Sequence, residues 1–357
     1  MKKNKNKGSF LAFLLCLVAG LLSVVIALFL LFEIQLGSVD SKKNSRTERF
    51  EIPSGSGIKA VASSLAEKNL IKSEGAFYFA ARFPFLIFMD RQPVLKSGVY
   101  SVSSSMNVRE ILSLFDSGKQ EYIKTVIPEG LTLKKIARLL EEKSVCSAED
   151  FIKEARDSAN LEKYNIHAAD FQGFLFPDTY NFAPGMSAKA ALFMMADNFF
   201  DHIKQIPEFN GKTPDEFYKT LILASIVERE YRVASEAPLI ASAFLNRIND
   251  GAGLYSCATI EYIITEIQGK PHPDVITYDD LKINSPYNTY KWAGLTPGPI
   301  SNPGMVALKA AAEPAKTDYR FFVLKGDGSG THNFTRTQSE HERAIISYRT
   351  KKAAGGN

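Results

Sequence analysis

The sequence predicts an α+β protein: an N-terminal transmembrane helix, then small αβ modules, then a C-terminal mixed α+β domain. Three observations point to this class. An uncharged apolar run lies near the N-terminus, a strand–turn–helix unit occurs twice within residues 50–160, and helical patterns followed by a hairpin fill residues 161–350. Roughly 300 residues follow the apolar run, which is enough for two or three domains.

The apolar run at residues 10–32 predicts a membrane-spanning helix. It carries no charge, and roughly 20 apolar residues cross a bilayer as a helix. The run is longer than a typical signal-peptide core and no small-residue cleavage site follows it, so a cleaved signal peptide is the weaker alternative. Four lysines within residues 1–9 predict a cytoplasmic N-terminus. We therefore expect a single-pass protein of the cell (inner) membrane with an extracytoplasmic globular part.

Composition excludes several classes of function. The formal net charge is only +4, and no basic stripe with interleaved aromatic residues is present, so no nucleic-acid partner is expected. Of the cysteines at positions 16, 146 and 257, the last two could pair, but one candidate pair in a large domain favours free thiols. No Cys/His cluster has the spacing of a zinc site, and we expect no metal or organic cofactor.

Residues 33–49 are polar and aperiodic and predict a stalk, and an internal repeat follows them. One copy begins with Phe-Glu-Ile-Pro-Ser-Gly at residues 50–55, and the other with Thr-Val-Ile-Pro-Glu-Gly at residues 125–130. Apolar residues then recur at i, i+3, i+4 and i+7, so each copy predicts a strand, a Pro-Gly turn and an amphipathic helix. Ser73 and Ser147 precede further helical pattern at matching places.

Between the two copies, residues 98–102 predict a strand and residues 107–115 predict a short helix. Small αβ units of this kind resemble LysM modules, and this resemblance implies that residues 50–160 bind N-acetylated glycans. The alternative is a structural αβ platform that binds nothing, because no aromatic ladder is visible in the turns.

The C-terminal domain begins with an apolar stretch at residues 171–180 that ends in a turn. Helical patterns follow at residues 187–205 and 214–248, and residues 284–304 are irregular and rich in Pro, Gly and Asn.

The end of this domain predicts a hairpin and a final helix. Strands at residues 319–324 and 331–335 are joined by a glycine-rich turn. The capping box Thr-Gln-Ser-Glu at residues 337–340 begins a helix that we expect to end near Arg349. Residues 351–357 predict a disordered tail.

Glu228 is the most informative residue because it is a carboxylate at the end of an apolar run, Leu-Ile-Leu-Ala-Ser-Ile-Val at residues 221–227. Apolar surroundings raise the pKa of a carboxylate, and a carboxylic acid still protonated near neutral pH can donate to a leaving-group oxygen. On a helix, the small side chains of Ala224 and Ser225 share its face and would leave space beside it. The alternative is an exposed glutamate near a helix end.

Glu230 lies roughly 200° around the same helix, so it should point away from Glu228. The two residues therefore do not predict the facing carboxylates of an ordinary glycosidase. Arg229, Arg232 and Glu236 predict a solvated, ion-paired far side.

The irregular segment at residues 284–304 carries a high density of Asn, Tyr and Pro. Amide and phenol groups suit sugar hydroxyl and acetamido groups, and the prolines reduce the entropy that a long loop loses when it holds a ligand. The alternative is a proline-stiffened structural loop.

With these motifs the chain resembles the membrane-anchored endolytic murein transglycosylases of the MltG, or YceG-like, family. The resemblance extends from the apolar run to the last helix. It rests on residues 173–180, Ala-Ser-Ile-Val-Glu-Arg-Glu at 224–230, Phe-Leu-Asn-Arg at 244–247, Ser-Pro-Tyr-Asn-Thr-Tyr at 285–290, Gly-Leu-Thr-Pro-Gly-Pro-Ile at 294–300, and an ending with His332, Phe334, Glu340 and His341.

Two departures from the family pattern are present. The chain has Cys257-Ala258-Thr259 where the family usually has Asp-Pro-Thr, and Gln172 where it tends to have glutamate. The first departure removes a carboxylate near the expected cleft.

The resemblance implies a peptidoglycan lytic transglycosylase, which cleaves the β-1,4 bond between N-acetylmuramic acid and N-acetylglucosamine without water. Glu228 would protonate the glycosidic oxygen and then accept the proton of the C6 hydroxyl as a 1,6-anhydro ring closes. An internal nucleophile has a high effective concentration, so no second carboxylate is required. The resemblance also implies cutting within nascent glycan strands, termination of their elongation, and peptidoglycan synthases as candidate partners.

Candidate residues for the site follow from the same motifs. The candidate substrate contacts are Tyr287, Asn288, Tyr290, Asn246 and Ser256. The candidate supporting residues are Glu230, Arg247 and His332.

Three alternatives compete with this function. A muramidase that uses water needs a second carboxylate, for which the candidates are Glu261, Glu266, Asp274, Asp279 and Asp280. A catalytically idle glycan-binding scaffold for cell-wall synthases is a second alternative. A Cys257 nucleophile with His272 or His332 is a third.

Overall fold

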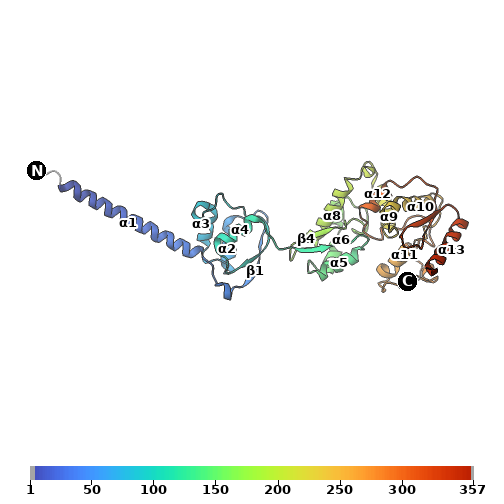
Figure 1. The fold of residues 1–357 in the computed structure, drawn as a ribbon, viewed down its shortest axis with the longest axis horizontal. Helices are drawn as coiled ribbons and strands as arrows, with labels where there is room; N and C mark the ends of the chain where they lie inside the picture. The colour runs from blue at the N-terminus through green and yellow to red at the C-terminus, as the bar shows by residue number, and fades with distance from the viewer. Residues whose placement is uncertain (1–4, 355–357) are drawn as a thin grey trace. The chain divides into compact units, whose positions relative to one another are not determined.

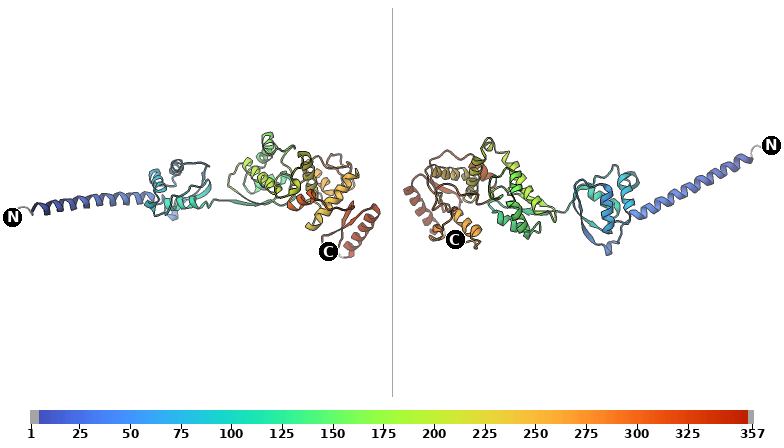
Figure 2. Two further views of the ribbon diagram at one scale, coloured as in Figure 1. Left: turned by 90° about the horizontal axis from the view of Figure 1, so that it is seen from above. Right: turned by 180° about the vertical axis from the view of Figure 1, so that it is seen from behind.

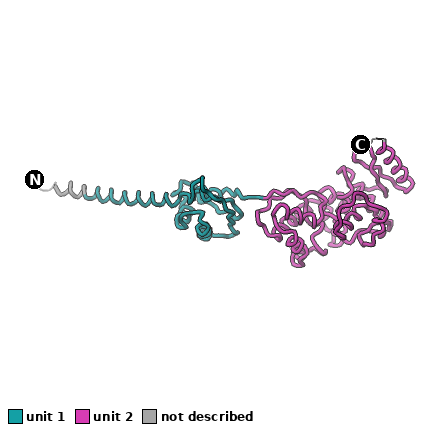
Figure 3. The backbone as a smooth tube through the Cα atoms, turned by 90° about the horizontal axis from the view of Figure 1, so that it is seen from below, with its two compact units in different colours: residues 1–122 teal, residues 123–357 magenta. Residues whose placement is uncertain are grey.

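The computed structural model describes the backbone of residues 5–354 and the side chains of residues 13–353 (Figures 1 and 2). Contacts divide the chain into two compact units, residues 1–122 and 123–357 (Figure 3). Each unit has its own buried core. Residues 1–4 of the expected cytoplasmic segment and residues 355–357 of the expected tail lie outside the described residues.

Helix α1, Lys5–Leu36, contains the apolar run, and its residues Phe13–Leu36 are long and apolar enough to cross a membrane. The helix continues past the expected end at residue 32 because its last turn is anchored in the first unit. Leu36 is buried in that core, and Glu33 forms an ion pair with Arg109 at 2.5 Å. The stalk prediction for residues 33–49 was therefore wrong at both ends, since a strand already begins at Thr47.

The first unit contains one copy of the repeat as an antiparallel β-α-α-β arrangement. Strand β1 pairs with β2 so that Phe50 lies opposite Tyr100, and both rings pack against Phe115. Its elements after α1 are β1 (Thr47–Ile52), α2 (Ile58–Glu67), α3 (Glu74–Arg82), β2 (Gly98–Ser103) and α4 (Val108–Ser117).

The second copy lies in the second unit and has the same arrangement with one additional short helix, α7, before its second strand. Ser73 and Ser147 accept backbone N–H groups at the starts of α3 and α6, as expected, and Phe77 and Phe151 are fully buried at matching places. Its elements are β3 (Ile123–Val126), α5 (Leu133–Glu142), α6 (Ala148–Arg156), α7 (Ser158–Lys163) and β4 (Thr179–Phe182), and β3 pairs with β4 in antiparallel register.

The division between units therefore falls at residues 122 and 123, earlier than the domain boundary at residues 160 and 161 that we expected from the sequence. The physical reason is that the second copy buries its apolar face against C-terminal residues. Its Ile127, Leu133 and Ile136 belong to the same core as Leu221 and Leu308.

The predicted pattern at residues 214–248 forms two helices, and the final helix packs along the β5–β6 hairpin (Figures 1 and 2). The remaining helices and strands are α8 (Ala188–Ile203), α9 (Pro214–Val227), α10 (Ala237–Asn249), α11 (Cys257–Tyr262), α12 (Met305–Ala312), β5 (Phe321–Leu324), β6 (His332–Thr335) and α13 (Gln338–Ala354). Short turns of 3-10 helix lie at Lys42–Asn44, Pro84–Ile87, Pro207–Phe209, Ala234–Glu236 and Asp280–Lys282, and a π-helical turn at Ile263–Ile267.

The capping box before α13 is confirmed, because Thr337 and Glu340 exchange side-chain to backbone hydrogen bonds. The helix runs to Ala354, past the expected end near Arg349. Residues 351–354 are consequently helical, and the disorder expected for them was wrong.

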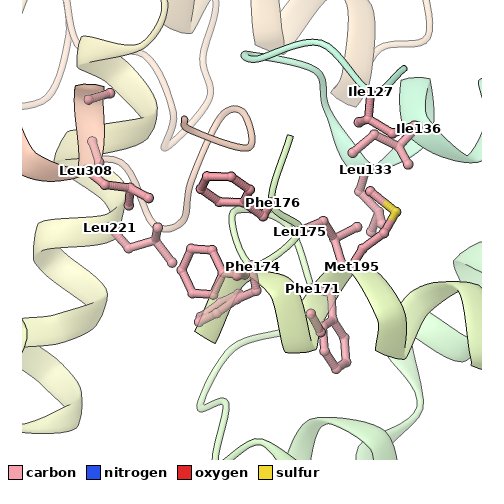
Figure 4. Packing of buried hydrophobic residues seen from close by; sticks show 14 of the residues in the cluster. Ile127, Leu133, Ile136, Phe171, Phe174, Leu175, Phe176, Met195, Leu221 and Leu308 are labelled. Carbon is pink, nitrogen blue, oxygen red and sulfur yellow. The ribbon is translucent and has the colours of Figure 1, made fainter. Parts of the chain in front are cut away.

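The apolar stretch at residues 171–176 fills the centre of the second core. Figure 4 shows Phe174 and Phe176 between Leu221 on one side and Leu133 on the other. This stretch therefore joins the second repeat copy to the helices that follow it.

Asn302 holds three segments together that are far apart in the sequence. Its side-chain oxygen accepts the N–H groups of Gly173 and Leu175 at 2.9 and 3.0 Å, and its amide nitrogen donates to the Leu131 carbonyl at 3.0 Å. Its backbone bonds the same loop through Gly130 and Leu131. Because Asn302 is almost fully buried, water does not replace these bonds.

Replacing Asn302 by alanine should destabilise the second unit. The change leaves buried polar groups without partners, so we expect the free energy of unfolding to fall by about 2–4 kcal/mol. Thermal melting of the full chain in detergent would then shift down by roughly 5–15 °C. Asn210→Ala, which removes an exposed amide, is the matched control. Equal melting temperatures for the two variants would contradict the role of Asn302.

Candidate active site

Helix α9 positions Glu228. The helix begins at a capping box between Thr213 and Glu216, and residues 221–227 are buried on every side. Glu228 is the residue at which the helix ends, and its side chain is half-buried. The C-terminal end of a helix carries partial negative charge, which disfavours a carboxylate there.

The space expected beside Glu228 is filled by the loop before α12. The Ser225 hydroxyl accepts the Ile300 N–H at 3.0 Å, and Ser301 donates to the Ser225 carbonyl at 2.9 Å. The Ser225 side chain thus bonds this loop to α9, and the expectation of an open space beside Glu228 was wrong.

The loop places a backbone donor against the Glu228 carboxylate. The Gly304 N–H donates to Glu228 Oε2 at 2.9 Å, and the Tyr231 hydroxyl lies 3.4 Å from Glu228 Oε1. Burial raises the pKa of Glu228 to about 7, while the bond from Gly304 opposes this rise and the charge of Glu129 adds to it. The expectation from sequence that the pKa of this carboxyl group is raised is confirmed, with burial as the cause.

Glu129 is a second carboxylate at the site, and the sequence analysis missed it. The Tyr231 hydroxyl lies 3.5 Å from Glu129 Oε2, as well as 3.4 Å from Glu228. Glu129 also covers Gly304, where an added Cβ would come within 1.9 Å of Glu129 Oε1. A signal was present: the second repeat copy has Glu129 where the first has Ser54.

Glu230 points away from Glu228, as expected, and is engaged elsewhere. It accepts a short hydrogen bond from the Ser256 hydroxyl, and burial raises its pKa. Ser256 is therefore tied to Glu230 and is almost fully buried.

The far side of the α9 end is less solvated than we expected. Arg229 forms an ion pair with the half-buried Glu261 at 2.7 Å and donates to the Gly130 carbonyl at 3.2 Å. Glu236 is buried and pairs with His332 at 2.8 Å. The prediction of a solvated surface was wrong for Glu236, because the β5–β6 hairpin covers it.

Two of the candidate substrate contacts bond within the protein. The Asn288 amide nitrogen donates to the carbonyls of Leu281 and Ile283, and its oxygen accepts the Tyr290 N–H. The Asn246 amide donates to two carbonyls of the segment before β5. These bonds give both amides a structural role in holding loops.

A cavity of about 690 Å³ lies beside Glu230. Its wall includes Arg247, which donates to the Leu254 carbonyl and stacks over Tyr255 and Phe321. Tyr255, which the sequence analysis missed, is exposed and has a positive φ of 50°, a strained conformation for an aromatic residue.

Tyr290 lies in the same wall and packs against Tyr255 with ring centroids 5.5 Å apart. Tyr287 is half-buried and packs against Tyr262 instead. Of the two candidate tyrosines, Tyr290 is thus the one that faces the cavity.

The cysteine–histidine nucleophile considered from the sequence is not assembled. Cys257 contacts the Tyr290 hydroxyl at 3.0 Å, whereas His272 pairs with Glu261 and His332 with Glu236. All three cysteines are free, as predicted. Within the described part of the chain, no group of three or more His, Cys, Asp or Glu side chains could hold a metal ion.

Comparison with known proteins identifies the family of this chain. The model of the YceG-like family matches residues 50–347, which is most of the chain. The chain belongs to the YceG-like family. A relative from Bacillus subtilis (strain 168), named endolytic murein transglycosylase, is 32% identical over 327 residues that cover 87% of each chain.

Two further proteins extend the comparison. A relative of the same name from Streptococcus pneumoniae serotype 2 (strain D39) is 28% identical, and the match covers 84% of this chain and 58% of that protein. A crystal structure of a yceG-like protein from Listeria monocytogenes is 30% identical, with a TM-score of 0.55, and the match covers 84% of this chain and 99% of that one.

Glu228 should make the protein less stable as pH rises. Its pKa is about 7 in the folded chain against an ordinary value of 4.5, so the folded state holds the extra proton between these values. Stability should therefore fall from about pH 4.5 to about pH 7. We expect the melting temperature of Glu228→Gln minus that of wild type to increase with pH across this window and to level off above about pH 8. A difference independent of pH would contradict the raised pKa.

Proposed function

We propose that this YceG-like chain is a membrane-anchored endolytic lytic transglycosylase of peptidoglycan, with Glu228 as its acid and base. The observation that carries the proposal is a carboxyl group held in its acid form near neutral pH by burial at the end of α9. The names of the relatives from Bacillus and Streptococcus supply the reaction class.

In the proposed reaction Glu228 donates its proton to the glycosidic oxygen while the bond from that oxygen to C1 of N-acetylmuramic acid breaks. The C6 hydroxyl of the same sugar then attacks C1 and returns its proton to Glu228. A 1,6-anhydro ring forms, no water is consumed, and Glu228 regains its starting state. A carboxyl group with a pKa of about 7 suits both steps, because its acid and its base form are both accessible near neutral pH.

The cavity beside Glu230, whose wall does not include Glu228, is the proposed binding region for sugar rings away from the cleaved bond. The exposed rings of Tyr255 and Tyr278 and the half-buried Tyr290 offer apolar faces with hydroxyl groups, which suits pyranose rings. Tyr287 and Ser256 remain proposed contacts, with Arg247 and Glu230 supporting the cavity wall.

Membrane attachment through α1 is part of the proposal, with residues 50–357 extracytoplasmic. Phe79 is exposed on α3, the helix that packs against α1, and Phe83 and Phe85 are exposed in the turn after it. Aromatic side chains are common where proteins meet the membrane surface. A chain anchored in the membrane would meet strands made there, which supports strand termination beside peptidoglycan synthases as the proposed role.

Glycan binding by the first β-α-α-β copy is a separate proposal. Its topology and its resemblance to LysM modules support it. A purely structural platform remains the alternative.

A muramidase that uses water is the second candidate function, and one observation favours it. Glu129 and Glu228 have oxygens within 3.5 Å of the same phenol oxygen, so these oxygens are at most about 7 Å apart. Hydrolytic glycosidases hold their carboxylates within a similar range. Glu261, one of the carboxylates predicted from sequence for this role, pairs with Arg229 and His272 instead.

Replacing Glu228 by glutamine should abolish cleavage of glycan strands. Glutamine keeps the shape of the side chain but supplies no proton, so we expect a rate loss of at least about 10²-fold. The measurement is digestion of purified uncrosslinked strands by the full chain in detergent, with mass analysis of the new ends.

Wild type should produce 1,6-anhydro ends, whereas ordinary reducing ends would show a hydrolase. Strands that both proteins bind and neither cuts would favour the idle scaffold. Glu142→Gln, which changes an exposed glutamate in the same unit, is the matched control and should cut like wild type.

The orientation of the chain can be tested with its own thiols. Cys257 is exposed, Cys146 is half-buried with a pKa that burial raises to about 11, and Cys16 lies in α1. A membrane-impermeant maleimide added to intact spheroplasts should label Cys257 fastest, and Cys257→Ser should remove most of the label. Labelling that requires cell lysis would contradict an extracytoplasmic site.

A further inference from the structure

Glu129 comes from the second repeat copy, in the Pro-Glu-Gly turn after β3. The corresponding turn of the first copy has Ser54, so the carboxylate is specific to the copy that packs in the second unit. The turn is held in place by Asn302, which bonds Gly130 and Leu131. The position of Glu129 beside the site is thus a consequence of the fold.

The Tyr231 hydroxyl connects Glu129 to Glu228. It has one hydrogen to donate, yet a carboxylate oxygen lies on each side of it at 3.4 and 3.5 Å, the long end of the hydrogen-bonding range. If both carboxylates were ionised, one would lack this donor. If one carboxyl is protonated, it can donate to the phenol oxygen while the phenol donates to the other carboxylate. The geometry therefore favours a single proton shared by the pair.

Solvent exposure decides which carboxyl group holds that proton. Glu129 is exposed, so water stabilises its ionised form, whereas Glu228 is half-buried at the negative end of α9. Among the described residues, the cation that acts on Glu228 is Arg229, which is already paired with Glu261 at 2.7 Å. The other groups that face Glu228 are the Tyr231 hydroxyl and the Gly304 N–H.

We infer that Glu129 is a positioning residue of the site: an ionised carboxylate that keeps Glu228 in its acid form through Tyr231 and through direct charge repulsion. This inference rests on the proposed function. Burial raises the pKa of Tyr231, and the two carboxylates add to this effect, so its hydroxyl keeps its proton. After Glu228 has given up its proton, repulsion from Glu129 makes the Glu228 carboxylate a stronger base for the C6 hydroxyl.

The test is the pH profile of strand cleavage by the full chain in detergent. A general acid works only while protonated, so the wild-type rate should fall above about pH 7, the pKa of Glu228. Glu129→Gln removes the repulsion, so this fall should move down by about 0.5–1 pH unit. The rate at pH 8 should then drop by about three- to tenfold, while the rate at pH 5.5 stays within about twofold of wild type.

Two further variants separate charge from folding. Glu129→Asp keeps the charge and should restore most of the wild-type profile. Gly304→Ala changes no charge and its φ of −86° suits alanine, but the added Cβ takes the place of the Glu129 carboxylate. It should therefore reproduce the profile of Glu129→Gln. Glu142→Gln is the control for loss of an exposed glutamate and should leave the profile unchanged.

The outcomes distinguish this inference from the proposed function. Anhydro ends from every active variant, with the shifted profile, support both. Anhydro ends with an unshifted profile for Glu129→Gln overturn the role of Glu129 alone. A folded Glu129→Gln that cuts at no pH also overturns it, because Glu129 would then take part in the chemistry itself. Reducing ends from wild type overturn the transglycosylase, and with it the inference.

Discussion

The site depends on the buried amide of Asn302. This side chain ties the turn after β3 to the apolar stretch of the core, and it stands two residues before Gly304. Two groups that approach Glu228 from distant parts of the chain, the Gly304 N–H and the Glu129 carboxylate, are therefore set by the same small hydrogen-bond cluster. Because that cluster is buried, its geometry is stiff, and a stiff site can hold a proton donor at a fixed place.

The electrostatics around Glu228 are a balance of opposing effects. Burial, the end of a helix and a neighbouring carboxylate favour the acid form, whereas the Gly304 N–H and Arg229 favour the carboxylate. Arg229 is partly neutralised by Glu261, so its influence is weakened. The resulting pKa of about 7 lies where one group can both donate and accept a proton, which is what a reaction with a single catalytic carboxyl group needs.

The two copies of the internal repeat have different structural roles. Both copies place a strand, two helices and an antiparallel partner strand in that order, the second copy with an additional short helix, and both have a serine cap before the second helix. The first buries the end of α1, through Leu36, and the second buries its apolar face in the core that carries the site. The Pro-Gly turns of the two copies also differ: the first has Ser54 where the second has Glu129.

The sequence by itself determined the apolar helix, both repeat copies, the hairpin with its capped final helix, and the raised pKa of Glu228. These features are local, because hydrophobic periodicity, turn residues and helix caps each depend on a short segment of the sequence. Only the tertiary structure decided that Asn288 and Asn246 hold loops, that Glu236 is buried against His332, and that Glu129 faces Glu228. Contacts between residues so distant along the chain depend on the packing of the core and on buried hydrogen bonds. Local sequence patterns do not predict them.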